Sequence, residues 1–228
     1  MRQQAGRNPC RRALALLGPL ILCVLSLSAG ASGGPDCSRP LSLALHDHGL
    51  LYSADTGTGI DRDVADELQR RSGCKIHVSL LPRARIWQLI ETGALDFSLS
   101  GISNAQRDKF AAFAWYFSNQ YYLLVRRDAQ LQKIEDCERN KAWQLGVIRG
   151  FRYSERANRL VDALAEQQRV NQSSGLTALF AALTAGQIQA MIIEPFDYPT
   201  LESARIRELS QVLEFGDKPV PHGLIMSR

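Results

Sequence analysis

The stretch "LIETGALDFSLS" at residues 89–100 places the end of an amphipathic helix, a glycine and an apolar strand in direct succession. A second stretch, "LTAGQIQAMIIE" at residues 183–194, repeats this order. A helix that leads into a buried strand is the repeating unit of a parallel α/β sheet. Because the unit occurs once in each half of the chain, we predict two lobes of similar α/β architecture.

The segments before the first stretch alternate between strand and helix. The run "LSLAL" at residues 41–45 reads as a strand, and residues 60–73, "IDRDVADELQRRSG", read as a helix with acidic residues in its first turn and arginines in its last. Gly73 is the expected stop signal. A strand is predicted at residues 76–81 and a helix at residues 83–93, ending at Gly93. This alternation predicts a parallel sheet with helices on its faces.

The second stretch is preceded by "WQLGVIRGF" at residues 143–151, another strand that ends in glycine. The second half of the chain therefore has enough elements for its own α/β lobe. No low-complexity linker separates the halves. We expect ordered crossings between the lobes, which would act as a hinge.

The N-terminal residues have the pattern of a secretory signal peptide. A basic segment precedes an apolar run at residues 13–27, and the small residues Ala29-Gly30-Ala31 follow as a cleavage site. The alternative is an uncleaved membrane anchor, which needs about 20 apolar residues and carries no cleavage signature. We predict that residues 1–31 are a signal peptide and that the mature chain is periplasmic.

Removal of this segment changes the charge balance. It holds four of the 27 Lys and Arg residues and none of the 23 Asp and Glu residues, so the mature chain is close to neutral. The net charge therefore gives no reason to expect nucleic acid or a membrane surface as a partner. About 195 residues remain, enough for one large domain or two small lobes.

Cys37, Cys74 and Cys137 follow the predicted signal peptide, and an oxidising compartment favours disulfides. Their spacing fits no zinc pattern. Cys37 lies just before the first predicted strand and Cys74 just before the second, and the starting ends of parallel neighbours lie side by side. We predict a Cys37–Cys74 disulfide with Cys137 free, although other pairings remain open.

Ligands of parallel α/β sheets bind beyond the carboxyl ends of the strands. Polar residues stand there at 46–48, 100–103, 149–152 and 194. The small residues at 100–103 would bring backbone N–H groups close to a ligand, and Arg107 could offer a planar fork to a carboxylate. Glu194, in the other lobe, could receive an ammonium group. A zwitterion fits between the two.

Each of these residues also has a simpler interpretation. Arg107 could be an exposed residue in the first turn of a helix "AQRDKFAAF", and Glu194, before Pro195, could be a solvated strand end. The "HDH" triplet at residues 46–48 lacks a third metal ligand and a recurring spacing, so we predict no metal. No nucleophile motif and no glycine-rich phosphate loop occur, so we predict neither a catalytic residue nor a cofactor.

Two strings, "GIDRDVADELQRRSG" and "LLPRARIWQLIETGALDFSLSGISNAQRDKFAAFAWYFSNQYYLLVRRD", contain an ordered set of motifs. In order along the chain, these motifs are similar to a helix with the pattern G-[FI]-D-x-D-[LV], the pattern L-x-x-G-x-x-D leading into a strand, and a turn that ends in Arg. An F-S-x-P-Y-Y segment and a strand with the pattern V-x-[RK] follow. From about residue 38 onward the chain thereby resembles the extracellular solute-binding proteins of family 3, the periplasmic polar amino-acid binding proteins of bacterial ABC importers.

The resemblance implies a two-lobed periplasmic binding protein-like II fold with a ligand cleft between the lobes. Residues 35–120 would form lobe 1, residues 121–218 lobe 2, and residues 219–228 would return to lobe 1 without the family's C-terminal helices. The turn's Arg107 would hold the α-carboxylate of the ligand and Glu194 its amino group. The small residues before Arg107 would add backbone and hydroxyl bonds, namely Ser100, Gly101 and Ser103.

The chain also departs from the family pattern. Gly150 and Phe151 stand where the family has a Gly-Thr pair, and Arg152 follows, which we expect to prefer an acidic group. The turn before Arg107 is one residue shorter than usual. Glu194 replaces the commoner Asp, and Gln189 replaces an Asp before the second-lobe strand.

The function that the resemblance implies is capture of a small polar solute, an amino acid above all, for an inner-membrane ABC permease, by a monomeric protein that is not an enzyme. The alternatives are an enzyme on the same fold, similar to cyclohexadienyl dehydratase, and a ligand-sensing module. The identity of the ligand and the role of Cys137 remain open.

Overall fold

The computed structural model describes residues 35–203 and 206–228. The predicted signal peptide, residues 1–31, lies outside the described residues. Within the described part, no helix has both the length and the apolar character needed to cross a membrane.

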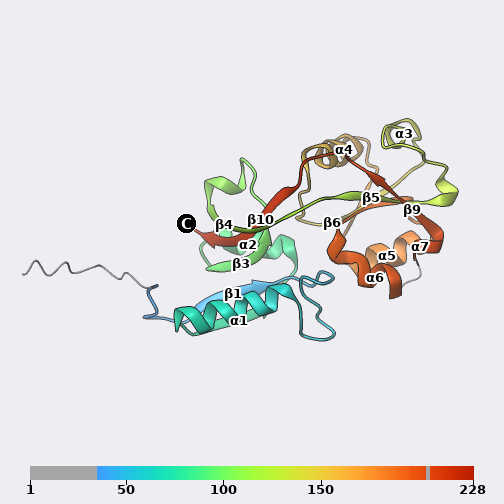
Figure 1. Cartoon of the computed structure of the whole chain (residues 1–228). Coiled ribbons are helices and arrows are strands. Elements are labelled where there is room, and N and C mark those ends of the chain that lie inside the picture. Colours follow the sequence, from blue (N-terminus) through green and yellow to red (C-terminus); the bar gives the residue numbers. More distant parts are fainter. Residues whose placement is uncertain (1–34, 204–205) are drawn as a thin grey trace, which may run out of the picture. The chain divides into compact units, whose positions relative to one another are not determined.

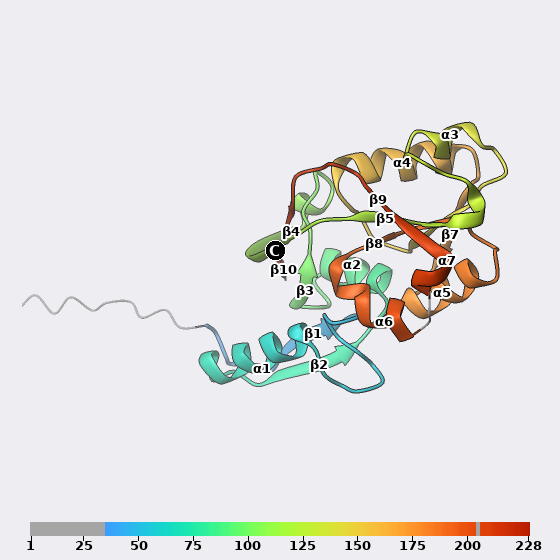
Figure 2. The ribbon, with the colours of Figure 1, turned by 45° about the vertical axis from the view of Figure 1, so that its right-hand side comes forward.

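The first sheet has the strand order β2-β1-β3-β10-β4 (Figures 1 and 2). β1 (Leu41–Leu45) lies parallel between β2 (Ile76–Leu80) and β3 (Phe97–Gly101). β10 (Val220–Ser227) is antiparallel both to β3 and to β4 (Ala111–Asn119). The sheet is therefore mixed, whereas the strand and helix alternation predicted only its parallel part.

Two helices cover the two faces of this sheet, as the alternating side chains of β1 require. Leu43 and Leu45 pack in one cluster with Ala65 of α1 (Ile60–Ser72). Ala44 packs in another with Ile86 and Ile90 of α2 (Arg83–Glu91).

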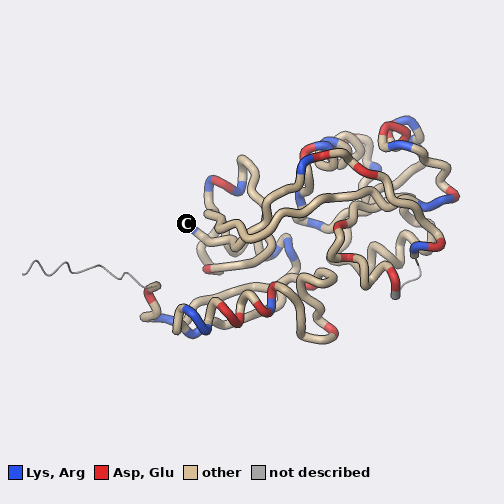
Figure 3. Tube along the Cα trace, viewed as in Figure 1, with Lys and Arg blue, Asp and Glu red and all other residues tan. Residues whose placement is uncertain are grey.

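Both helices end close to the predicted positions. α1 ends at Gly73, which takes the left-handed conformation (φ 71°), and its acidic first turn and basic last turn are visible in Figure 3. The capping residue of α2 is Thr92, one residue before the predicted Gly93, and Gly93 takes the positive φ (71°) that follows the helix.

The second sheet has the order β7-β6-β8-β5-β9; β6 is labelled in Figure 1 and the other four strands in Figure 2. β6 (Leu145–Ile148) lies parallel between β7 (Val170–Ser173) and β8 (Ala190–Ile193), and β5 (Tyr122–Arg126) is antiparallel to β8 and to β9 (Ser210–Glu214). One core cluster joins the sheet to α3 (Asp136–Arg139) and α4 (Glu155–Glu166). On the other face the helices are α5 (Leu176–Thr184), α6 (Tyr198–Ser203) and α7 (Ile206–Leu209).

The two repeated stretches, residues 89–100 and 183–194, occupy equivalent places in the two sheets. Residues 89–100 contain the end of α2 and most of β3, and residues 183–194 contain the end of α5 and β8. The chain passes between the two sheets twice, once from β4 to β5 and once from β9 to β10. We call the first sheet with α1 and α2 the first lobe, and the second sheet with α3 to α7 the second lobe.

One helix interpretation is wrong. The segment "AQRDKFAAF" contains only a 3₁₀ turn, η1 (Arg107–Lys109), after which β4 begins at Ala111. β4 pairs along its length with β10, for example Ala111 with Ser227. A partner so distant in the sequence overrides the local helical preference of the alanines.

The predicted disulfide is present between Cys37 and Cys74, with a Cα–Cα distance of 5.0 Å. Leu41 is in register with Ile76 in the parallel pair, so the segments leading into β1 and β2 run side by side. Cys137 is free and buried, and burial raises the pKa of its thiol to about 12. This thiol is therefore protonated and unreactive at neutral pH.

Candidate functional site

A small cavity of about 20 Å³ lies where the carboxyl ends of β3, β6 and β8 meet, as expected for an α/β protein. Of the eight predicted ligand residues, seven line it. The exception is Ser103, which is exposed and whose hydroxyl donates to Asp108 (3.3 Å). The lining residues are Leu51, Arg83, Trp87, Ser100, Gly101, Ile102, Tyr121, Arg107, Gly150, Phe151, Arg152, Glu194 and His222.

Arg107 is the first residue of η1, and only 7% of it is exposed. Its Nη1 donates to the carbonyl of Ile102 (2.9 Å) and its Nη2 to the carbonyl of Gly150 (2.8 Å), which belongs to the second lobe. The guanidinium stacks on the ring of Trp87, 3.8 Å from its centroid. Arg107 is thus not the exposed helix residue that the simpler interpretation expected.

The charge of Arg107 is held in an unfavourable environment. Burial, and then the nearby guanidinium of Arg83, lower the pKa of Arg107 to about 9. The side chain is still a cation at neutral pH. The partners of its described hydrogen bonds are neutral carbonyls.

Arg83, which the sequence analysis did not single out, is the first residue of α2 and is 4% exposed. Its Nη1 donates to the carbonyl of Leu99 (3.0 Å), and its guanidinium lies 5.4 Å from the centroid of the Phe151 ring. Burial lowers its pKa. The sequence did contain a signal that could have singled out Arg83. A cation in the first turn of a helix is disfavoured by the helix dipole, so an arginine at that position calls for another role.

Glu194 follows β8 and is 4% exposed, so the interpretation as a solvated strand end is wrong. Its two carboxylate oxygens accept hydrogen bonds from His48 Nε2 and from Asn119 Nδ2. Its backbone N–H donates to the carboxylate of Asp197 (3.0 Å). Since His48 follows β1, the pair of His48 and Glu194 joins the two lobes.

His48 is a buried histidine between two carboxylates. Burial alone lowers the pKa of His48, but Asp197 and Glu194 together outweigh it, so the pKa is raised. The pKa of Asp197 is raised to about 7 by burial and by the neighbouring Glu194. His46 stacks on His48 at 5.8 Å, and burial lowers the pKa of His46 to about 2, which keeps that ring neutral.

The side chains of His48, Glu194 and Asp197 could hold a metal ion, since one ligand atom of each lies within 4.8 Å of the others. No further ligand of this cluster stands near the "HDH" triplet in the sequence, because its two carboxylates come from residues 194 and 197. In the structure Glu194 is already bound by His48 and Asn119. We therefore describe the cluster as a hydrogen-bonded contact between the lobes.

Ser100, one residue before the end of β3, has a positive φ of 51°, a strained conformation for a residue other than glycine. Its hydroxyl donates to Asp61 (2.6 Å), and its N–H donates to the Tyr116 hydroxyl (2.8 Å). Tyr116 in turn donates to Asp61 (3.2 Å), whose pKa burial raises to about 6. The Ser100 hydroxyl is therefore committed to Asp61 rather than free for a ligand.

The second lobe contributes Phe151 and Arg152. The Phe151 ring lies 5.4 Å from the His46 ring and 5.0 Å from the His48 ring, so it fills space at the carboxyl end of β1. The guanidinium of Arg152 makes two hydrogen bonds to Asp162, at 2.8 and 2.9 Å. Its charge is therefore compensated within the second lobe.

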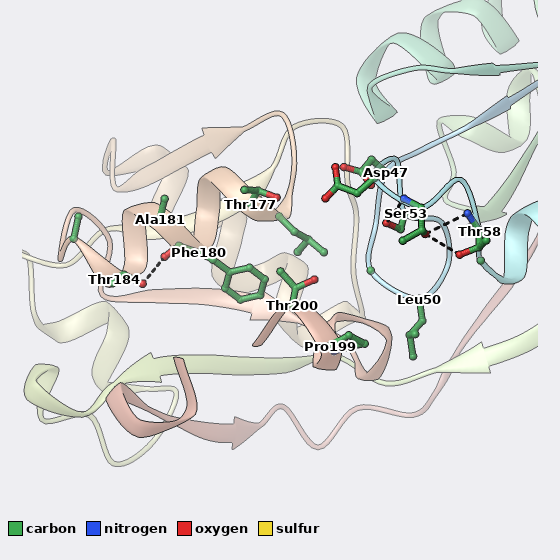
Figure 4. A pocket seen from close by; sticks show the side chains of 16 residues that line it. Asp47, Leu50, Ser53, Thr58, Thr177, Phe180, Ala181, Thr184, Pro199 and Thr200 are labelled. Carbon is green, nitrogen blue, oxygen red and sulfur yellow. Dashed lines mark hydrogen bonds between the residues drawn. The ribbon is translucent and has the colours of Figure 1, made fainter. Parts of the chain in front are cut away.

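A larger groove of about 980 Å³ lies between the loop after β1 and helices α5 and α6 (Figure 4). The charged residues that line it are both acidic, Asp47 and Asp55. Three of its polar residues are engaged locally: Asp47 accepts from the Ala54 N–H (2.9 Å), and Thr56 bonds to Thr58 (2.7 Å). None of the predicted ligand residues lines this groove, so the small cavity is the candidate site.

No protein-family model and no curated protein sequence matches the chain. Solved structures do. The arginine-, lysine-, histidine-binding protein ArtJ from Geobacillus stearothermophilus is 15% identical, with 83% of each chain covered and a TM-score of 0.70. A histidine-bound substrate-binding protein of an ABC uptake transporter from Streptococcus pneumoniae is 15% identical, with 83% of this chain and 80% of that chain covered and a TM-score of 0.68. Holo ArgBP from T. maritima is 18% identical, with 83% of each chain covered and a TM-score of 0.67.

These likenesses establish the fold. The chain has the two-lobed α/β fold of periplasmic binding proteins, as the resemblance predicted.

Proposed function

We propose that this protein is a solute-binding protein that captures a small solute with a carboxylate group, an amino acid above all, and delivers it to an ABC-type permease. The observation that carries the proposal is Arg107. It is a buried guanidinium at the carboxyl end of a parallel strand, at the junction of two lobes, and its hydrogen bonds go to neutral carbonyls. The similar structures of amino-acid-binding proteins support the same conclusion.

The described conformation is closed around a cavity of about 20 Å³, which is large enough for about one water molecule. A solute therefore enters only after the lobes part. The connections from β4 to β5 and from β9 to β10 are the proposed hinge. Opening would separate Arg107 from the Gly150 carbonyl and His48 from Glu194, and would break the hydrogen bond from Leu50 N–H to the Phe196 carbonyl (2.8 Å).

In the bound state the ligand carboxylate would replace the carbonyl partners of Arg107 as a bidentate acceptor. In the first lobe the backbone of Gly101 would line the carboxylate beside Ser100, whose N–H and hydroxyl are already bound, with Ser103 at the rim. The ammonium group of an amino acid would bind Glu194 by taking the place of His48. The second lobe would close over the ligand with Gly150, Phe151 and Arg152.

Calorimetric titration with the twenty amino acids tests this proposal. Loss of a charge-assisted hydrogen bond costs about 1.5–3 kcal/mol, so Arg107→Ala should weaken binding by about tenfold to more than a hundredfold. Arg107→Lys should lie between, because it keeps the charge and loses the planar fork. Lys109→Ala, in the same 3₁₀ turn, is the matched control. If Arg107→Ala binds the ligand as tightly as the parent protein, Arg107 is not part of the binding site and the proposed site is wrong.

We further propose export to the periplasm and a monomeric state. N-terminal sequencing of periplasmic material should begin after about residue 31, and a sequence that begins at Met1 contradicts the proposed signal peptide. Sedimentation analysis should give the mass of one chain.

An enzyme on the same fold is the second candidate. The observation that favours it is the buried pair of His48 and Glu194, because Glu194 lines the cavity and His48 has a raised pKa. Incubation with prephenate or arogenate should give no aromatic product if the protein only binds its ligand. If the parent protein forms an aromatic product and His48→Gln does not, the protein is an enzyme.

A further inference from the structure

Two buried guanidinium groups line one cavity without a carboxylate partner. Arg83 is 4% exposed and Arg107 is 7% exposed. Within the described residues, neither forms an ion pair, and their hydrogen bonds go to backbone carbonyls. Taking a charge out of water is unfavourable unless an opposite charge compensates it.

Burial lowers the pKa of Arg83 and outweighs Asp61 and Glu194, which act on Arg83 without bonding to it and raise its pKa. The carbonyl of Leu99 needs a donor, which a neutral glutamine could supply. Arg83 also stands in the first turn of α2, where the helix dipole disfavours a cation. The two cations repel each other as well, since Arg83 contributes to the lowered pKa of Arg107.

The acidic groups near the cavity are already engaged. Glu194 accepts from His48 and Asn119. Asp61 accepts from Ser100 and Tyr116 and does not line the cavity. Arg152, the third arginine of the lining, has its own partner in Asp162. Of the charged residues that line the cavity, Arg83 and Arg107 are the ones that form no ion pair within the described residues.

We propose that the ligand is a small dicarboxylate, with Arg107 binding one carboxylate and Arg83 the other. This inference rests on the proposed function, whose site it extends by Arg83. The common chemistry is two carboxylates on a short carbon chain, found in acidic amino acids and in plain dicarboxylic acids. Phe151, which packs near Arg83 in the closed form, moves away with the second lobe and frees the guanidinium for the ligand.

The test compares diacids with their amides by calorimetric titration. L-glutamate and L-aspartate represent the amino diacids, succinate and glutarate the plain diacids, and L-glutamine, L-asparagine and L-arginine the competitors. A diacid should bind at least about tenfold more tightly than the amides, as expected for one charge-assisted contact. Tighter binding of the amino diacids than of the plain diacids identifies an acidic amino acid as the ligand, and the reverse order a dicarboxylic acid.

Arg83→Gln should remove this preference, because it keeps a donor for the Leu99 carbonyl and loses the charge. Arg85→Gln changes an exposed arginine of the same helix and should leave the preference intact. The ligand-free Arg83→Gln protein should unfold at the same or a higher temperature than the parent, because an unpaired buried charge is gone. A structural role for Arg83 would instead lower the unfolding temperature and leave the preference unchanged.

The outcomes separate this inference from the proposed function. Tighter binding of L-glutamine or L-arginine than of every diacid overturns the dicarboxylate inference and leaves solute binding intact. If none of the four diacids binds, the inference also fails. Absence of binding by all twenty amino acids and all four diacids overturns both. If Arg83→Gln does not fold, the ligand preference of the parent protein still decides.

Discussion

Substitution of Gly150 by alanine should hold the two lobes apart. Gly150 has a φ of +82°, and a Cβ atom there would lie 2.7 Å from the Cα and 2.8 Å from the N of Ala84, in the first lobe. Ordinary van der Waals contact begins at 3.4 Å. Both clashing atoms are backbone at the start of α2, so no side-chain rotation relieves the overlap. The lobes must separate by several tenths of an ångström.

The energetic effect follows from the contacts at the same point. The hydrogen bond from Arg107 to the Gly150 carbonyl is 2.8 Å long in the closed form. A separation of this size stretches it beyond the usual limit of about 3.2 Å, and a bond with a charged donor contributes about 1.5–3 kcal/mol. The population of the ligand-free closed form should therefore fall by about tenfold to a hundredfold. The left-handed conformation of alanine adds a local penalty of about 1–2 kcal/mol.

Gly73→Ala is the matched control, because Gly73 has a φ of +71° and a Cβ atom added there would meet nothing within 4 Å. Both variants should lose stability in urea unfolding, but only Gly150→Ala should show a larger radius of gyration in small-angle scattering of the ligand-free protein. If the ligand-free Gly150→Ala protein keeps the radius of gyration of the parent, the lobes do not close through this contact and the reasoning is refuted.

Two further predictions concern stability. Replacing both Cys37 and Cys74 by serine opens a loop with a sequence separation of 37, which should lower the free energy of unfolding by about 4 kcal/mol in urea titration; a loss below about 1 kcal/mol would contradict the loop-entropy account. His48→Gln tests the contact between the lobes, since Gln keeps a donor for Glu194 but cannot be protonated. Because the pKa of His48 is raised in the folded protein, its contribution is fully present below the unfolded value of about 6.5 and is lost as the pH rises through the folded value. The stability difference between parent and variant should therefore be larger at about pH 5.5 than at about pH 9 in urea titrations, and an equal difference would exclude a protonated His48.

Much of the fold could be predicted because its signals are local. The helix at residues 60–72 carried its apolar spacing, its charged ends and its glycine stop within 14 residues of sequence. The repeated helix–glycine–strand unit likewise located β3 and β8. β4 could not be recognised locally, because its alanines favour a helix and only pairing with β10 makes the segment a strand.

The same division applies to the candidate site. The rule that ligands bind at the carboxyl ends of parallel strands brought seven of the eight predicted residues to one cavity. The rule did not find Arg83, which begins a helix and reaches the cavity only because α2 packs against the sheet.

The sequence by itself determined the periods of the helices and strands, the positions of the glycines that end them, and the set of strand ends at which a ligand could bind, because these depend on residues a few positions apart. Only the tertiary structure decided which charges are compensated. Glu194 meets His48 across 146 positions and Ser100 meets Asp61 across 39, while the guanidinium groups of Arg83 and Arg107 bond to backbone carbonyls and form no ion pair within the described chain. The strength of an electrostatic interaction depends on distance in space and on burial, and neither quantity is encoded in any local stretch of the sequence.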